Sequence, residues 1–282
     1  MTFAIVTDST ASLPADLVRR YDLTVVPLEV VVGDRVFVEG EDITADEVAQ
    51  ALRSGATVST SRPSPEALAR CYETLAAQGA EAIVSVHLSS AVSATFESAQ
   101  IAAQDAPVPV LCVDTLEVGM ASGYAAVAAA RAREAGASAE DAAKAATECA
   151  ERATTLFYVA TLEHLRRGGR IGAASALVGS ALAVKPLLSV REGQVRPVEK
   201  VRTASRAIAR LEELALQAAT LQADGVAVAV QHLDAPEAAQ ALADRLAEQL
   251  GLDSVPVVEV SAVVGAHVGP GLLAVTVAPV SR

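Results

Sequence analysis

Two hydroxyl-rich segments carry the residues best suited to binding chemistry in this sequence. The first, residues 60–65, reads TSRPSP and opens a predicted helix, with Ser64 suited to the N-cap and Pro65 to the first helical position. A helix start presents unpaired N–H groups, and these groups and the helix dipole favour an anion. We therefore expect an anion site around Thr60 and Ser61, although helix capping alone would also explain the pattern.

The second segment, residues 89–95, reads SSAVSAT, follows an apolar run and again opens a predicted helix. It contains four hydroxyl side chains: Ser89, Ser90, Ser93 and Thr95. A helix cap needs only one or two of them, so the surplus donors indicate a ligand. Serine-rich turns can also satisfy themselves by bonding to the local backbone, and that alternative stays open.

A third candidate is His267, within the GAHVGPG segment at residues 265–271. The Gly-Pro-Gly step predicts a type II turn with Pro270 and Gly271 at its centre. Such a turn would hold His267 on a stiff backbone beside the last strand, where its imidazole could donate to a carboxylate. An isolated histidine is more often a structural residue.

Basic residues cluster at residues 162–170, which read as a helix that ends at glycine. Helix capping accounts for Arg166, Arg167 and Gly168. Arg170 and Arg202 lie beyond such constraints and could meet a phosphate or an acidic partner. A solvated basic surface is the simpler account of both.

The usual signatures of cofactor and metal chemistry are absent from the sequence. It has no P-loop, no strand-linked GxGxxG and no HExxH. Cys71, Cys112 and Cys149 are far apart and lack metal-ligand spacing, which fits reduced thiols. We therefore expect no metal and no cofactor.

The composition excludes several classes of protein. A chain of 282 residues can bury a large core and suggests two domains. No apolar run approaches the roughly 20 residues that a bilayer span needs. The first residues read as a strand rather than a signal peptide, so we expect a cytoplasmic protein. A net charge of −12 argues against a nucleic-acid partner.

The first half of the sequence alternates strand and helix patterns. Apolar β-rich runs are predicted at residues 4–7, 24–32, 82–87 and 108–113, and helices at 65–78, 93–104 and 117–135. Such alternation predicts a parallel sheet flanked by helices. Because ligands in open α/β sheets bind outside the carboxyl ends of the strands, the hydroxyl-rich loops are well placed to form a site.

The pattern changes after a predicted helix at residues 138–153, and we place a domain boundary near residue 155. Residues 1–155 would form the N-terminal α/β domain, and residues 156–282 a C-terminal α/β domain with a mixed sheet. The second domain is predicted to contain strands at 156–161, 187–190, 195–201, 226–231 and 272–277, a hairpin turn at Glu192-Gly193, and a helix at 236–250.

Together these motifs resemble the DegV family, in the family's order and over essentially the whole chain. The matching segments are Thr7-Asp8-Ser9-Thr10, Thr60-Ser61 with Pro63-Ser64-Pro65, Ser89-Ser90-Ala91 with Ser93 and Thr95, Arg167-Gly168-Gly169-Arg170-Ile171, Lys185-Pro186, Lys200 with Arg202-Thr203, and Gly265 and His267 with Gly269-Pro270-Gly271.

The resemblance implies a two-domain α/β fold that encloses one long-chain fatty acid between its domains. In the fatty-acid-binding subunits of bacterial fatty acid kinase, the bound acid is presented to a separate ATP-dependent subunit that phosphorylates the carboxylate. Carried over by position, Ser61, Ser93 and His267 would hold the carboxylate. Arg170 and Arg202 would serve the kinase encounter or the phosphoryl step. The chain itself would have no catalytic residue, and a transient contact with a membrane surface would be compatible with this role.

Two positions depart from the family's pattern. Arg62 stands where the family usually has glutamine, and Ala94 stands where glycine is common. Arg62 adds a positive charge near the expected anion and could change the preferred head group. Ala94 could narrow the approach of the backbone to the ligand.

Two other functions remain open at the level of sequence. One is a serine hydrolase that uses Ser93 or Ser61 with His267 and an acid such as Asp8, although no GxSxG segment supports it. The other is a binding or regulatory module for a different anionic lipid or small molecule.

Overall fold

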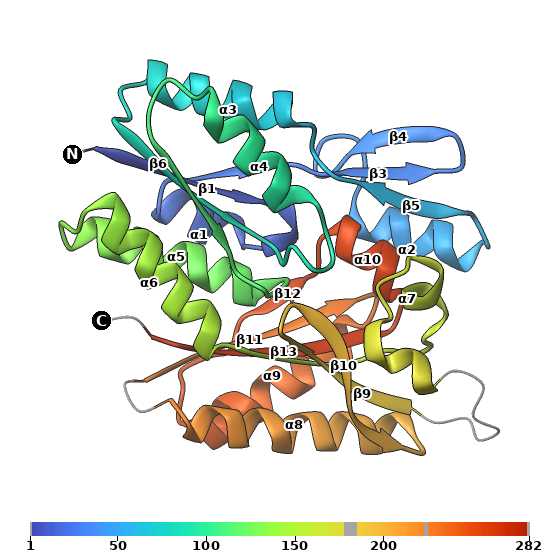
Figure 1. Cartoon of the computed structure of the whole chain (residues 1–282). Coiled ribbons are helices and arrows are strands. Elements are labelled where there is room, and N and C mark those ends of the chain that lie inside the picture. The colour runs from blue at the N-terminus through green and yellow to red at the C-terminus, as the bar shows by residue number, and fades with distance from the viewer. Residues whose placement is uncertain (1, 178–184, 223–224, 281–282) are drawn as a thin grey trace.

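The computed structural model describes residues 2–177, 185–222 and 225–280. Its N-terminal half contains a parallel four-stranded sheet in the order β2-β1-β6-β7 (Figure 1). The strands are β1 (Phe3–Asp8), β2 (Leu23–Val26), β6 (Ala82–His87) and β7 (Val110–Asp114). The predicted parallel sheet is therefore confirmed.

Helices cover both faces of this sheet because neighbouring residues of each strand point to opposite sides. Val6 and Ile83 pack against α3 (Pro65–Ala77) and α4 (Thr95–Gln104). Their neighbours Ile5 and Val84 pack on the other side. The helices on that side are α1 (Ala15–Arg20), α5 (Met120–Glu134) and α6 (Ala139–Arg152).

A small antiparallel sheet, ordered β4-β3-β5, lies beside the parallel one. Its elements are β3 (Glu29–Val32), β4 (Arg35–Val38), β5 (Val58–Ser61) and the neighbouring helix α2 (Ala45–Arg53). The prediction of one strand over residues 24–32 was wrong, since β2 and β3 belong to different sheets. Pro27 lies between them and has no N–H to continue a ladder of hydrogen bonds.

The C-terminal half forms a mixed six-stranded sheet in the order β10-β9-β8-β13-β11-β12 (Figure 1). Its strands are β8 (Thr154–Tyr158), β9 (Lys185–Arg191), β10 (Gln194–Val201), β11 (Val226–Leu233), β12 (Val257–Glu259) and β13 (Leu272–Pro279). The hairpin predicted at Glu192-Gly193 joins β9 to β10. The domain boundary near residue 155 remains a prediction.

The two faces of this sheet have different surroundings. Leu156, Leu187 and Val275 pack under α8 (Ala204–Thr220) and α9 (Pro236–Leu250). Phe157, Leu188 and Ala274 face the opposite way. They share a core with α2, the small sheet, α7 (Glu163–Arg167) and α10 (Ala262–Val268). This second core lies where the two halves of the chain meet. None of the helices in the described ranges is long and apolar enough to span a membrane.

Candidate functional site

A cavity of about 220 Å³ lies between the two halves of the chain. Most of its wall is aliphatic or aromatic, with contributions from Leu28, Val92, Phe157, Val190, Val263 and Leu272. One group of polar lining residues comes from β5, the loop before α4, the segment after α7, and α10. These are Thr60, Ser61, Ser93, Arg170 and His267, which we call the head cluster. The fold thus brings together site residues that are far apart in sequence.

His267 lies in α10, a short helix that was not predicted, and the predicted turn at Pro270 and Gly271 follows it. Its Nε2 is 2.8 Å from Oγ1 of Thr60. Its Nδ1 is buried and has no hydrogen-bond partner within the described residues. A proton on Nε2 can be donated to Thr60, which leaves the Thr60 hydroxyl proton available to a ligand.

Burial and the positive charge of Arg170 lower the pKa of His267 to about 4. The imidazole is therefore neutral at pH 7, and Arg170 supplies the nearby positive charge. A neutral donor beside a half-buried cation suits an anionic ligand better than a cationic one. An anion placed between them would in turn raise the pKa of His267.

The position of His267 depends on Gly168. A Cβ added at Gly168 would overlap Nδ1 of His267 and lie 2.9 Å from its Cε1. Capping was expected to explain this glycine, but Gly168 has an ordinary helical φ of −74°. The left-handed residue is its neighbour Gly169, with φ 72°. Gly168 is the C-cap of α7, so the helix ends at this glycine as predicted. Capping at this φ does not require glycine, however, and the need for glycine comes from close packing against the imidazole of His267.

A reciprocal contact joins the same two helices. A Cβ added at Gly269, just after α10, would overlap the imidazole of His164 in α7. Each glycine thus makes room for a histidine of the other segment. The RRGGR and GAHVGPG segments, read separately in the sequence, are two sides of one packed contact.

Helix capping does not explain the hydroxyls of the head cluster. Ser64 caps α3 as predicted, accepting a hydrogen bond from the Ala67 N–H at 3.2 Å. Thr60 and Ser61 precede that cap and lie in β5. The N-cap of α4 is Ala94, which has no capping side chain. The cluster's hydroxyls are therefore in excess of what the helix starts need.

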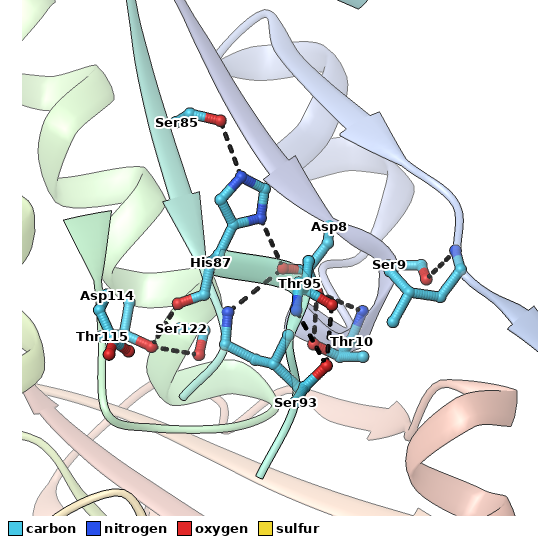
Figure 2. Close-up of polar contacts among 12 residues, drawn as sticks. Asp8, Ser9, Thr10, Ser85, His87, Ser93, Thr95, Asp114, Thr115 and Ser122 are labelled. Atoms are coloured by element: carbon cyan, nitrogen blue, oxygen red, sulfur yellow. Dashed lines mark hydrogen bonds and ion pairs between the residues drawn. The ribbon is translucent and has the colours of Figure 1, made fainter. Parts of the chain in front are cut away.

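The hydroxyl groups of the loop at residues 89–95 have different roles: some hold the loop in place, and one faces the cavity. Ser89 is buried and donates to the carbonyl oxygen of Gly193 at 2.8 Å, which ties this loop to the β9–β10 hairpin. Ser90 is exposed. Ser93 Oγ is 2.9 Å from Thr95 Oγ1 and accepts from the Thr95 N–H, so its own proton can point to a ligand (Figure 2).

Ser61 lines the cavity, but its hydroxyl already has an acceptor. Ser61 Oγ donates to Oε2 of Glu29, opposite it on β3, at 2.6 Å. To hold a carboxylate, Ser61 must exchange this partner for the ligand. Its role as a ligand donor remains a prediction, and Thr60 is the hydroxyl of β5 that contacts His267.

The three arginines singled out in the sequence occupy different places. Arg170 lines the cavity, and its guanidinium donates to the carbonyl oxygens of Val92 at 2.9 Å and Gly168 at 2.6 Å. Arg62 also lines it and pairs with Glu97 at 3.2 Å. Arg202 follows β10 and is exposed. Arg170 is therefore placed to act on the ligand, while its contact with a kinase partner stays a prediction.

The serine hydrolase alternative requires a contact between Asp8 and His267, and the structure does not have this contact. Oδ2 of Asp8 is 2.9 Å from Nδ1 of His87, whose Nε2 is 2.8 Å from Ser85 Oγ (Figure 2). The array resembles a Ser-His-Asp triad, but Ser85 and His87 are completely buried, and Ser85 also bonds to Tyr72. A substrate cannot reach Ser85, so we assign these residues to the structure of the sheet.

A second polar part of the cavity was not anticipated. Thr10, Thr155 and Gln231 also line it, and Glu117 lies behind Thr155. The only signal in the sequence was a glutamine at the end of the apolar run VAVAV at residues 226–230. Within the described residues, no group of His, Cys, Asp and Glu side chains is arranged to hold a metal ion.

Comparisons with known proteins agree with this architecture. A family model described as "Uncharacterised protein, DegV family" matches residues 2–280. A DegV domain-containing protein of Streptomyces coelicolor is 54% identical over 277 residues, which cover 97% of each chain. One of Mycobacterium tuberculosis is 37% identical over 282 residues, covering 98% of this chain and 97% of the relative.

Two solved structures are similar over almost their full length. A DegV family protein from Thermus thermophilus, described for its fatty acid binding, has a TM-score of 0.92 and 34% identity, covering 99% of this chain and 100% of that one. DegV from Bacillus subtilis, described as a fatty acid binding protein, has a TM-score of 0.90 and 31% identity, with the same coverage.

Proposed function

This chain belongs to the DegV family, and from that premise we propose that it binds one long-chain fatty acid in the cavity between its two halves. The observation that carries the proposal is a largely apolar cavity in which one group of hydroxyls, an imidazole and a guanidinium converge. A water-sized group needs roughly 10 to 15 Å³ of such space. A cavity of about 220 Å³ is many times larger than this, so it can hold a ligand of many non-hydrogen atoms.

Tail and head would contribute differently to affinity. Burial of about 15 methylenes at roughly 0.8 kcal/mol each gives on the order of 12 kcal/mol before association costs are subtracted. A hydrogen bond to a charged head group contributes about 1.5 to 3 kcal/mol. The tail thus supplies most of the affinity, whereas the head cluster fixes the position of the carboxylate.

We assign the carboxylate to Ser61, Ser93 and His267, with His267 acting through Thr60: its Nε2 proton is donated to Thr60, whose own hydroxyl proton then serves the carboxylate. Arg170 neutralises the charge from within the cavity wall. The loop hydroxyls of Ser89 and Thr95 hold this arrangement in place. No residue of the chain is assigned a catalytic role.

We further propose that the bound acid is presented to a separate ATP-dependent kinase subunit, which would phosphorylate the carboxylate to an acyl-phosphate in the cytoplasm. Held by its head group, the acid would keep its reactive oxygen at a constant position while the tail stays out of water. Arg202, exposed after β10, is the residue we assign to the encounter with this partner.

The binding proposal is tested by extracting the purified protein with solvent and analysing the extract by mass spectrometry. We expect a long-chain fatty acid in the extract, and a higher melting temperature when fatty acid is added back to delipidated protein. An extract that contains another anionic lipid would favour the alternative of a different binding module. An extract without any acyl chain, together with an unchanged melting temperature, would refute the proposal.

Replacing Ser93 with alanine should weaken fatty-acid binding by about tenfold or more, because one hydrogen bond to the charged head group is lost. The affinity of delipidated protein for a fluorescent fatty acid measures this effect. Ser90→Ala is the matched control, since Ser90 is in the same loop but exposed. Equal affinities of the two variants would contradict the assignment of Ser93.

Replacing Arg202 with alanine should leave bound fatty acid in place and reduce acyl-phosphate formation by the kinase partner. The reason is that Arg202 is exposed and is not a lining residue of the cavity. Lipid retention by mass spectrometry and turnover in the reconstituted pair measure the two effects. Arg19→Ala, on exposed α1, is the control. Loss of the lipid from Arg202→Ala would move this residue into the binding site.

A further inference from the structure

The second polar part of the cavity wall has unused hydrogen-bonding capacity. Gln231 is 2% exposed, Thr155 5% and Thr10 0%, and all three line the cavity. A purely hydrocarbon tail would place methylenes against these groups. Each of the three already has a partner within the protein, and what a hydrocarbon tail would leave unused is their remaining lone pairs and amide proton. Polar groups with spare capacity in the wall of a lipid cavity therefore call for a reason.

The two threonines direct their protons away from the cavity. Thr10 donates to Oδ1 of Asp8, and Thr155 donates to Oε2 of Glu117 at 2.7 Å. A hydroxyl oxygen has two lone pairs, so each threonine can still accept a hydrogen bond from a ligand. This part of the wall therefore offers two acceptors.

Gln231 offers the complementary donor. Its Oε1 accepts from the Met120 N–H at 2.9 Å, and its Nε2 donates to Oγ1 of Thr276 at 3.0 Å. An amide nitrogen carries two protons, and the described part of the chain supplies an acceptor for one. The other proton remains for whatever occupies the cavity.

The orientation of Gln231 is built into the fold. A Cβ added at Gly119 would lie 2.5 Å from Oε1 of Gln231, so the backbone before α5 closes tightly on this amide. On the other side, Thr276 is the direct cross-strand partner of Thr155. Gln231, Thr276 and Thr155 therefore form one continuous polar row on the sheet face beneath the cavity.

A single donor next to acceptors matches a hydroxyl group, which both donates and accepts. We propose that the cavity selects hydroxylated fatty acids over unsubstituted ones, with Gln231 donating to the ligand hydroxyl and the oxygen of Thr155 or Thr10 accepting its proton. This inference rests on the proposed fatty-acid binding and specifies its ligand class. The head cluster would hold the carboxylate of either kind of acid.

The test compares delipidated protein with stearic acid and with hydroxystearic acids whose hydroxyl lies near the carboxylate, at mid-chain or near the terminal methyl. Titration calorimetry should show at least one hydroxylated isomer binding about five to ten times more tightly than stearic acid. Gln231→Leu should reduce that ratio to about one. Ser189→Ala, in β9 and outside the cavity lining, should leave the ratio unchanged.

Gln231→Leu also removes the acceptor for the Met120 N–H, so Thr155→Val provides a second variant that should lower the same ratio if the first does not fold. The inference is overturned if stearic acid binds as tightly as every hydroxylated isomer, or if Gln231→Leu keeps the preference. Either result leaves fatty-acid binding itself intact. Failure of both classes of acid to bind would overturn the proposed function as well.

Discussion

Replacing Gly168 with alanine is expected to weaken fatty-acid binding by about one to two orders of magnitude, although Gly168 lies outside the cavity lining. The new Cβ would overlap Nδ1 of His267, so the imidazole must move away from Thr60. The resulting loss of a donor to the charged head group accounts for most of the effect. Overpacking at this contact also costs about 1 to 3 kcal/mol of stability.

Gly169→Ala is the matched control for this experiment. Gly169 has φ 72°, and a Cβ added there meets nothing within 4 Å. Its alanine variant should lose about 1 kcal/mol of stability through backbone strain, without displacing His267. Affinity for a fluorescent fatty acid and melting temperature, measured on both variants, separate loss of the site from loss of stability.

A double-mutant cycle between residues 168 and 267 tests whether Gly168 affects binding through His267. Once His267 is replaced by alanine, the overlap with a side chain at residue 168 disappears. Gly168→Ala should then cost little further affinity, so the two substitutions should be strongly non-additive. Additive losses would show that Gly168 acts through another contact.

The sequence was informative where local patterns and tertiary structure agree. Strand β6 and helix α9 have the predicted boundaries. The strand is an apolar run bounded by polar residues, and the helix is an amphipathic stretch that starts at Pro236, so the local sequence specifies where each element begins and ends. The start of α3 was also predicted, since Ser64 and Pro65 specify it chemically. The split between β2 and β3 was missed, because both strands are apolar and their assignment to different sheets depends on distant partners.

For the site, too, the sequence predicted features that depend on neighbouring residues and did not predict contacts between distant ones. The hydroxyl loops and His267 were identified from residue types, and Thr60, Ser61, Ser93 and His267 line the cavity. Ser89, Ser90 and Thr95 of the same loops are not lining residues. The contact between Gly168 and His267 joins positions 99 residues apart, so no local pattern contains it. The pairing of Ser61 with Glu29 was likewise invisible, since it depends on the register of β3 against β5.

Glu117 was also not identified from the sequence. It is a buried carboxyl group whose replacement is expected to change the stability of the protein strongly. Its side chain is buried at the junction of the two halves, where its Oε2 accepts from Thr155 Oγ1 at 2.7 Å. Burial raises the pKa of this carboxyl from 4.5 to about 8, against the smaller opposing effect of the Thr155 hydrogen bond. Glu117 is therefore protonated in the folded protein at neutral pH.

A raised pKa makes the folded state bind more protons than the unfolded state between pH 4.5 and about 8. The contribution of Glu117 to stability is fully present below pH 4.5 and is lost as the pH rises through this range. Each pH unit corresponds to about 1.4 kcal/mol, so the total loss is on the order of 3 to 5 kcal/mol. The wild-type protein should consequently become less stable toward pH 8.

Glu117→Gln should remove this loss, since glutamine is uncharged at every pH and its oxygen can still accept from Thr155. At pH 8.5 the variant should melt on the order of 5 °C or more above the wild type. The difference should shrink steadily toward pH 5. Circular dichroism is a suitable readout because the chain has no tryptophan. Glu140→Gln, exposed in the first turn of α6, controls for the loss of one negative charge.

The contribution of His267 to stability has the opposite pH dependence. It is the same in the wild type and in Glu117→Gln, so it cancels when the two melting temperatures are compared. The lowered pKa of His267 means that the unfolded state binds the extra proton, so stability falls as the pH drops from about 6.5 to 4. Both proteins contain His267, so their difference reports Glu117 alone. Parallel melting curves across the pH range would show that Glu117 is ionised in the folded protein. Its carboxylate would then have to be solvated at the junction between the two halves.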